Sequence, residues 1–551
     1  MLISFLLLAI LGVFMGNTAQ PVGVQPAAII TVNTYADELN EDGDCSVREA
    51  IQAANTDTAV DGCPAGVGED LIVLAAGVYM LTLAGANEDL NATGDLDILA
   101  DLVLRGARLD GTQFDGAQLD RVLHILPGVK VTISDLTISN GQAPTPEGDQ
   151  PGAPGGGVLN EGTLTLARVA LRHNRAGAGR NHNGGDGGGI FNSGAFTLTL
   201  GEVRHNEAGA GGNNGGNGGN GGGIANSGHM TLTQSVILSN TAGGGGVPAS
   251  IIFPEGGFGG SGGGVSNTGI GLIDQSVIHN NGSGNSKNYI GGAGGGVYNS
   301  GSIVLTHSAI HNNYTGVGSR TVGPPIIVGG SGGHGAGIFN AGMLLATNCT
   351  ISQNETASGI RELGGTHTVG GSGGDGAGIY NRHTLNVSHC TISFNGTGAG
   401  APGFAQAGQD GDGGGIFNAN TVTATVALKS SLVAGNTAAG EGATCHGTLL
   451  SHDYNLLTDL LRCTLTGPTD HNLVGLDALL LPLDNSSGAT ATHAIAFGSP
   501  AIDAGSCTDL QGNVVTTDQR SELRPQQKTC DIGAYEAAPP KTLIYLAIIQ
   551  R

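Results

Sequence analysis

Hydrophobic residues in the middle of the chain follow a short alternating pattern that repeats with a fixed spacing. A motif of small residues, a β-branched residue, one variable residue and an asparagine occurs eight times, as in GGGIFN at residues 187–192. A second asparagine lies 14 residues after the first in seven units and 18 residues after it in the eighth. Apolar positions between the two asparagines are two or three residues apart, which indicates strands rather than helices.

The asparagines define a rigid part of each unit. The first of each pair are Asn160, Asn192, Asn226, Asn267, Asn299, Asn340, Asn381 and Asn418, and the second are Asn174, Asn206, Asn240, Asn281, Asn313, Asn354, Asn395 and Asn436. Successive first asparagines are 32 to 41 residues apart, so the rest of each unit varies in length. Because a slip of one residue turns every side chain of a strand to the opposite face, a constant spacing is what stacked strands require.

These patterns predict an all-β fold: a single right-handed parallel β-helix with long glycine-rich loops on one corner. Aligned residues such as Ile310, Ile351 and Ile392 should stack into a thin core that needs few aromatic side chains. The first eight asparagines are predicted to form a structural ladder at the corners, where asparagine also tolerates the left-handed conformation. Cys349 and Cys390 hold one inward position in neighbouring coils, so we expect them in contact, either bridged or merely packed.

The N-terminal part of the chain differs from the repeats. An apolar run at residues 2–15 predicts a secretory signal peptide, with an uncleaved anchor as the alternative. Further on, Ser46 and Glu49 have capping-box spacing, so we expect a short helix that Asn55 can end and that a Cys45–Cys63 disulfide holds over the first coil. The resulting divisions are a signal peptide at 1–19, a cap at 29–96, coils at 97–436, C-terminal coils with a terminal region at 437–536, and a tail at 537–551.

Composition narrows the classes of function. The chain of 551 residues contains 101 glycines and no tryptophan, and its net charge is −23. An acidic surface with few lysines and arginines argues against nucleic acid and anionic membranes as partners. No transmembrane span is expected beyond the signal sequence, because the apolar run at residues 543–549 is too short to cross a bilayer. The eight cysteines lack CxxC spacing, which favours disulfides in an exported protein over a metal site.

The two ends and the repeats resemble known bacterial families. The stretch at residues 30–57, with CSVREA at its centre, resembles the CSLREA-type N-terminal domain of secreted β-helix proteins, with Val47 in place of leucine. The GGGI-x-N units resemble the repeat of polymorphic outer-membrane proteins. THAIAFGSPAIDAG at 492–505 and CDIGAYE at 530–536 resemble the choice-of-anchor Q region, although SSGAT at 486–490 departs from the usual turn.

What these resemblances imply is export, a β-helix and a defined set of disulfides. In the choice-of-anchor pattern Cys445 pairs with Cys463, and Cys507 pairs with Cys530. The families imply location at the bacterial cell surface or in the medium. They imply no known reaction.

One column of polar residues offers candidate chemistry. Six residues before the first asparagine of successive units stand Asp186, Asn220, Ser261, Ala293, His334, Asp375 and Asp412. His334, Asp375 and Asp412 belong to consecutive coils, which would place neighbours about 5 Å apart. Carboxylates at this separation suit cleavage of glycosidic bonds, with Asp375 as acid and Asp412 as nucleophile. The alternative is that polar side chains among glycines merely face water, and it is favoured because no aromatic platform for sugars is visible.

Metal binding is a further expectation at the same residues. GGSGGD at residues 370–375 imitates the start of the nonapeptide calcium repeat, so Asp375 and Asp412 are candidate calcium ligands, although the nine-residue period is absent. No other cofactor is expected. His173, His205, His279 and His311 fall near one corner. Their columns differ by one residue between coils, which favours a solvated polar edge over a metal stripe.

The sequence favours a non-enzymatic protein, an adhesin or structural scaffold of the bacterial envelope. Loops at residues 247–260 and 320–330 carry isoleucine, phenylalanine and proline, and exposed apolar loops on a secreted rod are typical of partner contact. The expected partner is an extracellular polysaccharide or protein. The alternative is an enzyme that acts on polysaccharides, a lyase or a hydrolase, with carboxylates on the coil faces.

Overall fold

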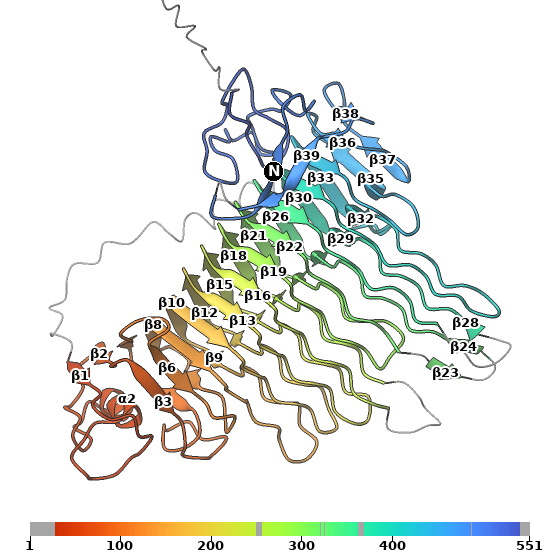
Figure 1. Cartoon of the computed structure of the whole chain (residues 1–551). Coiled ribbons are helices and arrows are strands. Elements are labelled where there is room, and N and C mark those ends of the chain that lie inside the picture. The colour runs from red at the N-terminus through yellow and green to blue at the C-terminus, as the bar shows by residue number, and fades with distance from the viewer. Residues whose placement is uncertain are drawn as a thin grey trace, which may run out of the picture.

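The chain folds as one right-handed parallel β-helix, as the repeat predicts (Figure 1). The computed structural model describes residues 28–248, 256–319, 321–323, 326–361, 368–485 and 488–539. The predicted signal peptide and most of the predicted tail lie outside these residues, as do parts of the two apolar loops and of the SSGAT turn. In the part that is described, no helix is long and apolar enough to cross a membrane.

Each repeat coil contains three short strands. In one coil these are β11 (Ile190–Asn192), β12 (Ala195–Thr199) and β13 (Glu202–Arg204). Every strand pairs in parallel with its equivalent in the next coil, and each pair joins residues of the same sequence column. The constant spacing between asparagines is therefore the register of the sheet.

The strands fall into three stacks along the axis. The first strands are β9 (Val158–Asn160), β11, β14 (Ile224–Asn226), β17 (Val265–Asn267), β20 (Val297–Asn299), β25 (Ile338–Asn340), β29 (Ile379–Asn381) and β32 (Ile416–Asn418). The second strands are β12, β15 (His229–Thr233), β18 (Ile270–Asp274), β21 (Ser302–Thr306), β26 (Met343–Thr347), β30 (Thr384–Ser388) and β33 (Thr425–Lys429). The third strands are β13, β16 (Val236–Leu238), β19 (Val277–His279), β22 (Ala309–His311), β27 (Thr350–Ser352), β31 (Thr391–Ser393) and β34 (Leu432–Ala434), and β10 (Thr163–Arg172) spans the second and third stacks.

Further strands lie at both ends of the chain and beside one loop region. At the N-terminal end these are β1 (Ile29–Thr31), β2 (Asp70–Val73), β3 (Gly77–Met80), β4 (Leu96–Ile98), β5 (Leu102–Arg105), β6 (Thr112–Asp115), β7 (Leu123–Ile125) and β8 (Lys130–Ser139). At the C-terminal end they are β35 (Cys445–Ser451), β36 (Leu456–Leu457), β37 (Cys463–Thr466), β38 (Leu473–Val474), β39 (Leu480–Asp484) and β40 (Thr492–Ile495). Those from β1 to β8 and from β35 to β38 extend the helix, whereas β39 and β40 form a separate antiparallel pair. A small separate sheet joins β23 (Thr321–Gly323), β24 (Ile326–Val328) and β28 (Thr368–Val369).

The core is a column of aliphatic side chains inside the coils. Ile310 pairs with Ile351, which pairs with Ile392, and all three are at most 1% exposed. The equivalent residues of the other coils are buried in the same way. Because each coil contributes only one layer of side chains, β-branched and leucine residues fill the interior without tryptophan.

Two asparagine ladders run along the corners. In the first, the Nδ2 of each residue from Asn160 to Asn381 donates to the Oδ1 of the next, at 2.6 to 2.9 Å. In the second, each Oδ1 accepts both the backbone N–H and the Nδ2 of the preceding coil, as Asn313 does from Asn281. The ladder asparagines do not use the left-handed conformation that asparagine tolerates. At the second corner that conformation belongs to the preceding residue, such as Phe394 with φ 55°.

The glycine-rich loops form an ordered layer of stacked backbone (Figure 1). Each loop has an outgoing and a returning arm, and hydrogen bonds run in a zigzag between arms. Gly185 N–H donates to Gly177, Gly209 to Gly185 and Gly219 to Gly209, each at 2.8 Å. A Cβ at Gly209 would collide with the carbonyl oxygen of Gly177. Glycine is therefore required in the arms because backbone packs directly on backbone.

A short helix closes the N-terminal end. Helix α2 (Val47–Thr56) has Ser46 as its N-cap and a complete capping box with Glu49, as predicted. The helix does not end at Asn55. Its cap is Asp57, with φ 50°, whereas Asn55 bonds through its side chain to the backbone of Asp97 and Leu99.

Arg48 of the signature CSVREA belongs to helix α2, and its side chain is fully buried. Its Nε lies 2.6 Å from Asp37, and its Nη atoms donate to the carbonyl oxygens of Gly94 and Asp95. Asp37 in turn accepts the N–H of Thr82. The arginine therefore ties the cap to the segment that leads into β4.

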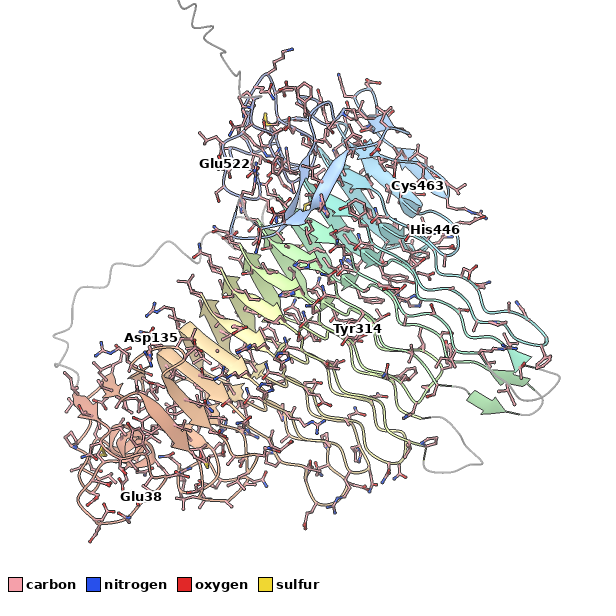
Figure 2. All side chains as sticks on the ribbon, in the orientation of Figure 1. Glu38, Asp135, Tyr314, His446, Cys463 and Glu522 are labelled. Carbon is pink, nitrogen blue, oxygen red and sulfur yellow. A yellow bond between two sulfur atoms is a disulfide. The ribbon has the colours of Figure 1, made fainter. Side chains whose placement is uncertain are left out.

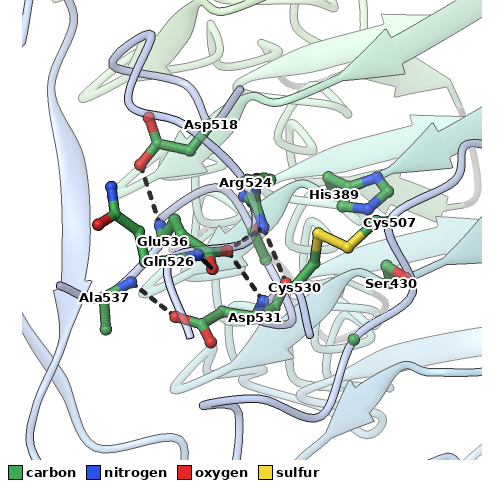
Figure 3. A network of polar contacts seen from close by, with 12 residues as sticks. His389, Ser430, Cys507, Asp518, Arg524, Gln526, Cys530, Asp531, Glu536 and Ala537 are labelled. Atoms are coloured by element: carbon green, nitrogen blue, oxygen red, sulfur yellow. Dashed lines mark hydrogen bonds and ion pairs between the residues drawn. A yellow bond between two sulfur atoms is a disulfide. The ribbon is translucent and has the colours of Figure 1, made fainter. Parts of the chain in front are cut away.

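The C-terminal residues fold back along the coils. After β38 the chain forms the antiparallel pair β39–β40 and then irregular segments. His389 Nε2 lies 2.6 Å from the carbonyl oxygen of Ser506, and Thr350 Oγ1 donates to Gln519. A buried ion pair between Arg524 and Glu536, 3.1 Å apart, holds these segments together (Figure 3).

All eight cysteines are paired. The disulfides are Cys45–Cys63, Cys349–Cys390, Cys445–Cys463 and Cys507–Cys530, with Cα atoms 4.6 to 5.5 Å apart. Cys349 and Cys390 are thus bridged between neighbouring coils rather than merely packed.

Candidate functional site

The predicted polar column lies at the edge of the loop layer, just before the first strand of each coil. Its side chains have a shared contact that the sequence did not reveal. Asp186 Oδ1 accepts the backbone N–H of Asn220 at 2.6 Å, and Asp375 Oδ1 accepts that of Asp412 at 2.9 Å. In the same way, Asp412 Oδ1 accepts the backbone N–H of Glu441 at 2.7 Å. The column therefore satisfies backbone donors along the edge of the helix, in addition to any chemistry at particular members.

The structure brings His334, Asp375 and Asp412 together on consecutive coils. His334 Nδ1 accepts the Asp375 N–H at 2.9 Å and lies 3.5 Å from its Oδ2. Since Nδ1 is an acceptor, the ring proton must sit on Nε2. The side chains of the three residues are 24%, 24% and 33% exposed, so each remains reachable from solvent.

Burial sets the protonation of this group. It lowers the pKa of His334, which keeps the imidazole neutral. Burial also raises the pKa of Asp375, and the nearby Asp412 carboxylate acts in the same direction. His334 and the hydrogen bond from the Asp412 N–H oppose this rise. Asp375 is therefore a carboxyl group with an increased tendency to hold a proton.

An aromatic row lies beside these groups. Tyr298, Phe339, Tyr380 and Phe417 stack in sequence with ring centroids 5.3, 5.0 and 4.9 Å apart. His446 follows at 4.6 Å and marks the C-terminal end of the row in Figure 2. Because the rings stack, neighbouring rings cover the faces of Phe339 and Tyr380. Phe339 is buried, whereas Tyr298, Tyr380 and Phe417 are half-buried.

Aromatic residues thus flank the site, although stacking covers the ring faces that would serve as a platform for sugars. The row occupies the variable position of the repeated motif, between the β-branched residue and the asparagine, so it was visible in VYN, IFN and IYN. His334 joins it by stacking on Tyr380 at 4.8 Å. The polar column and the aromatic row are thus in contact.

The face between the two columns is hollowed towards the N-terminus. A cavity of about 470 Å³ is lined by Asp186, Asn220 and Ser261 of the polar column. Phe191, which occupies the position equivalent to the aromatic row, lines the other side, together with Phe258. The outer face therefore has a largely polar depression beside this part of the polar column.

The candidate calcium ligands Asp375 and Asp412 each have one histidine nearby but belong to no cluster of three ligands in the part of the chain that the structure describes. Three groups of acidic or histidine side chains among the described residues have ligand atoms within 4.8 Å of one another, and neither Asp375 nor Asp412 belongs to them. The four corner histidines form two separate stacks, His173 on His205 and His279 on His311. Burial lowers the pKa of His311 to about 4, so this part of the corner is less solvated than the sequence suggested.

Comparisons with known proteins concern the fold alone. No protein-family model and no curated protein matches the chain, so the three family resemblances stay expectations. The solved structure of pectate lyase Pel9A is similar at 13% identity and a TM-score of 0.39, over 93% of this chain and 97% of that one. The A-module of the Azotobacter vinelandii mannuronan C-5 epimerase AlgE4 is similar at 13% identity and 0.28, over 80% and 96%. That of epimerase AlgE6 is similar at 15% and 0.25, over 80% and 94%.

The prediction from the sequence, which favours a protein that is not an enzyme, is contradicted by these similarities. The similar structures are those of a polysaccharide lyase and of epimerases, which are enzymes. Since identities this low bear on the fold only, any chemistry has to be argued from the residues of this chain.

Proposed function

We propose that the chain is an extracellular enzyme that binds an extended polysaccharide along its outer face and cleaves it beside Asp375 and Asp412. The observation that carries the proposal is the alignment of His334, Asp375 and Asp412 on consecutive coils, in contact with the aromatic row. A linear polymer repeats along its length, as the coils do, and so can meet equivalent groups on several coils.

Binding would use the edge of the aromatic row and the polar column together. The hydroxyls of Tyr298 and Tyr380 offer hydrogen bonds, and the ring edges, which carry the positive side of the ring quadrupole, can face sugar oxygens. The Nε2–H of His334 is a further donor, because its Nδ1 is already occupied by the Asp375 N–H. The depression near Asp186 extends the same face for more distant sugar units.

Cleavage would follow the two-carboxylate scheme. Asp375, whose pKa burial raises, would protonate the glycosidic oxygen as the bond to the leaving sugar breaks. The Asp412 carboxylate would attack the anomeric carbon and form a glycosyl ester. Water would then hydrolyse this ester, with Asp375 accepting its proton. Adjacent coils are about 4.8 Å apart, close to the roughly 5–5.5 Å between carboxyl groups in retaining enzymes.

Export to the bacterial surface or medium is part of the proposal. The apolar run at residues 2–15 and four disulfides support it, because disulfides persist in oxidising compartments. The CSLREA-type signature and the choice-of-anchor pattern support the same location.

The test is a cleavage screen against acidic and neutral polysaccharides, scored by released reducing ends and by the ultraviolet absorbance of unsaturated products. Asp375→Asn and Asp412→Asn keep the oxygen that accepts the backbone N–H, so the fold should persist. We expect either change to reduce cleavage at least about 100-fold. Asp410→Asn is the matched control, because Asp410 is exposed, lies in the same loop and also accepts a backbone N–H.

Three results would contradict the proposal. One is that no polysaccharide is cleaved. Another is equal cleavage by Asp375→Asn, Asp412→Asn and the control. The third is an unsaturated product, which would replace hydrolysis by elimination and assign Asp375 a different role.

A further inference from the structure

A cluster of ionisable side chains lies on the coils that precede the first repeat. Asp97 on β4 and His124 on β7 are direct partners in the parallel ladder. Asp89, in the segment between β3 and β4, completes a group whose ligand atoms lie within 4.8 Å of one another. His124 Nδ1 is 3.2 Å from Asp97 Oδ1 and 3.5 Å from Asp89 Oδ1. Three elements therefore direct side chains to one point.

The orientation of His124 is fixed by a fourth residue. Its Nε2 lies 3.1 Å from Glu161 Oε2. Because a carboxylate can only accept, Nε2 carries a proton towards Glu161. Nδ1 faces Asp89 and Asp97, where a metal ion can take the place of the proton that otherwise pairs with Asp97. A carboxylate that holds the far nitrogen of an imidazole in this way is the usual support of a metal-bound histidine.

Two buried carboxylates in this place lack hydrogen bonds that burial normally demands. Asp97 is fully buried, and its Oδ2 accepts the Asn91 N–H, whereas its Oδ1 has no hydrogen bond and pairs only with His124 Nδ1 at 3.2 Å. Asp95, 4% exposed, lines an adjoining hollow of about 270 Å³, which His124 and Asp89 also line. Its Oδ2 has no hydrogen bond either and is 3.4 Å from Arg121 Nε. Buried carboxylates need a balancing cation, which is Arg121 for Asp95 and either protonated His124 or a bound metal ion for Asp97.

We propose that Asp89, Asp97 and His124 bind a divalent transition-metal ion of the Zn²⁺ class. Ligand atoms about 2.0–2.2 Å from a tetrahedral ion are about 3.3–3.5 Å from one another. The measured separations of 3.2 and 3.5 Å between Nδ1 and the two carboxylate oxygens fit this geometry. An imidazole with two carboxylates suits zinc, whereas calcium prefers six to eight oxygens. The hollow leaves a fourth position open to water or a ligand.

The test is calorimetric titration of the full chain with Zn²⁺, Ca²⁺ and Mg²⁺ after treatment with a chelator. We expect one equivalent of Zn²⁺ to bind, and Co²⁺ to give the visible spectrum of a tetrahedral site. Asp89→Asn and His124→Ala should each weaken zinc binding at least about 10-fold, and Glu161→Gln should weaken it by about 10-fold or more. His229→Ala is the control, because His229 is exposed on a distant coil.

Asp89→Asn decides the outcome if His124→Ala fails to fold, because the Asp89 side chain is 67% exposed and its amide is nearly isosteric. Absence of zinc binding would overturn the proposal. Equal zinc binding by Asp89→Asn and the wild-type chain would also overturn it. Neither result depends on whether the chain cleaves polysaccharides.

Discussion

Replacing Asn313 by alanine should destabilise the helix at the centre of the second ladder. The Asn313 side chain makes five hydrogen bonds. Its Oδ1 accepts the backbone N–H and the Nδ2 of Asn281, each at 3.0 Å. Its Nδ2 donates to the carbonyl oxygens of Ile278 and His311 and to Asn354 Oδ1.

The size of the effect follows from which partners remain satisfied. Asn354 Oδ1 keeps the backbone N–H of residue 313, so it is not orphaned. The backbone N–H of Asn281 loses its acceptor inside the structure, which costs about 1–3 kcal/mol for a buried donor. One further net hydrogen bond, at the buried carbonyl of Ile278, adds about 1 kcal/mol. We therefore expect the free energy of unfolding to fall by about 3 kcal/mol.

Urea unfolding followed by far-ultraviolet circular dichroism measures this change. The midpoint should move to lower urea at an unchanged slope. His229→Ala, an exposed change on β15, should stay within about 0.5 kcal/mol of the wild-type chain. A midpoint for Asn313→Ala equal to that of the control would refute the argument that the ladder satisfies buried backbone donors.

Three other predictions concern the disulfide, the buried histidine and the cap. Joint replacement of Cys349 and Cys390 by serine removes a cross-link between residues 41 positions apart. The free energy of unfolding measured in urea should fall by up to about 4 kcal/mol, and an unchanged value would argue against the disulfide. Burial lowers the pKa of His389 to about 3, below the roughly 6.5 of the unfolded chain. The stabilisation that neutral, buried His389 gives to the folded state is therefore complete above about pH 6.5, and it is lost as the pH falls towards 3. From pH 7 to 5 the wild-type chain should lose about 2 kcal/mol more than His389→Gln, and parallel pH profiles would contradict this. Arg48→Ala leaves the Asp37 carboxylate buried without its ion-pair partner, so the free energy of unfolding should fall by about 3–5 kcal/mol. Proteolysis of the cap should become faster, and an unchanged cleavage rate would show that the ion pair is dispensable.

The fold could be predicted from the sequence because the register of the stacked strands fixes the spacing of equivalent residues along the chain. The constant interval between asparagines keeps equivalent residues in register, and residues such as Ile310, Ile351 and Ile392 therefore stack along the axis of the helix. The left-handed corner residue was misplaced because spacing does not report φ. Phe394 takes that conformation, which its residue type does not suggest.

The candidate sites were only partly predictable. The carboxylates Asp375 and Asp412 could be aligned because the motif gives them a reference point. The Asp97–His124 cluster could not, because its coils lack the motif and Asp89 reaches it from an irregular segment. Burial of Arg48 was also hidden, since only the fold shows that Asp37 lies beneath the same helix.

The stacked glycine arms restrict how this protein can change over evolutionary time. Gly177, Gly185, Gly209 and Gly219 each meet backbone where a methyl group would stand, so a point mutation there removes a contact that no side chain can replace. The outgoing and returning arms of a loop can still be lengthened or shortened together, because such a change leaves the corners of the coil in place. The protein can therefore change its width in steps shared by neighbouring turns, while residue-by-residue drift within the arms is suppressed.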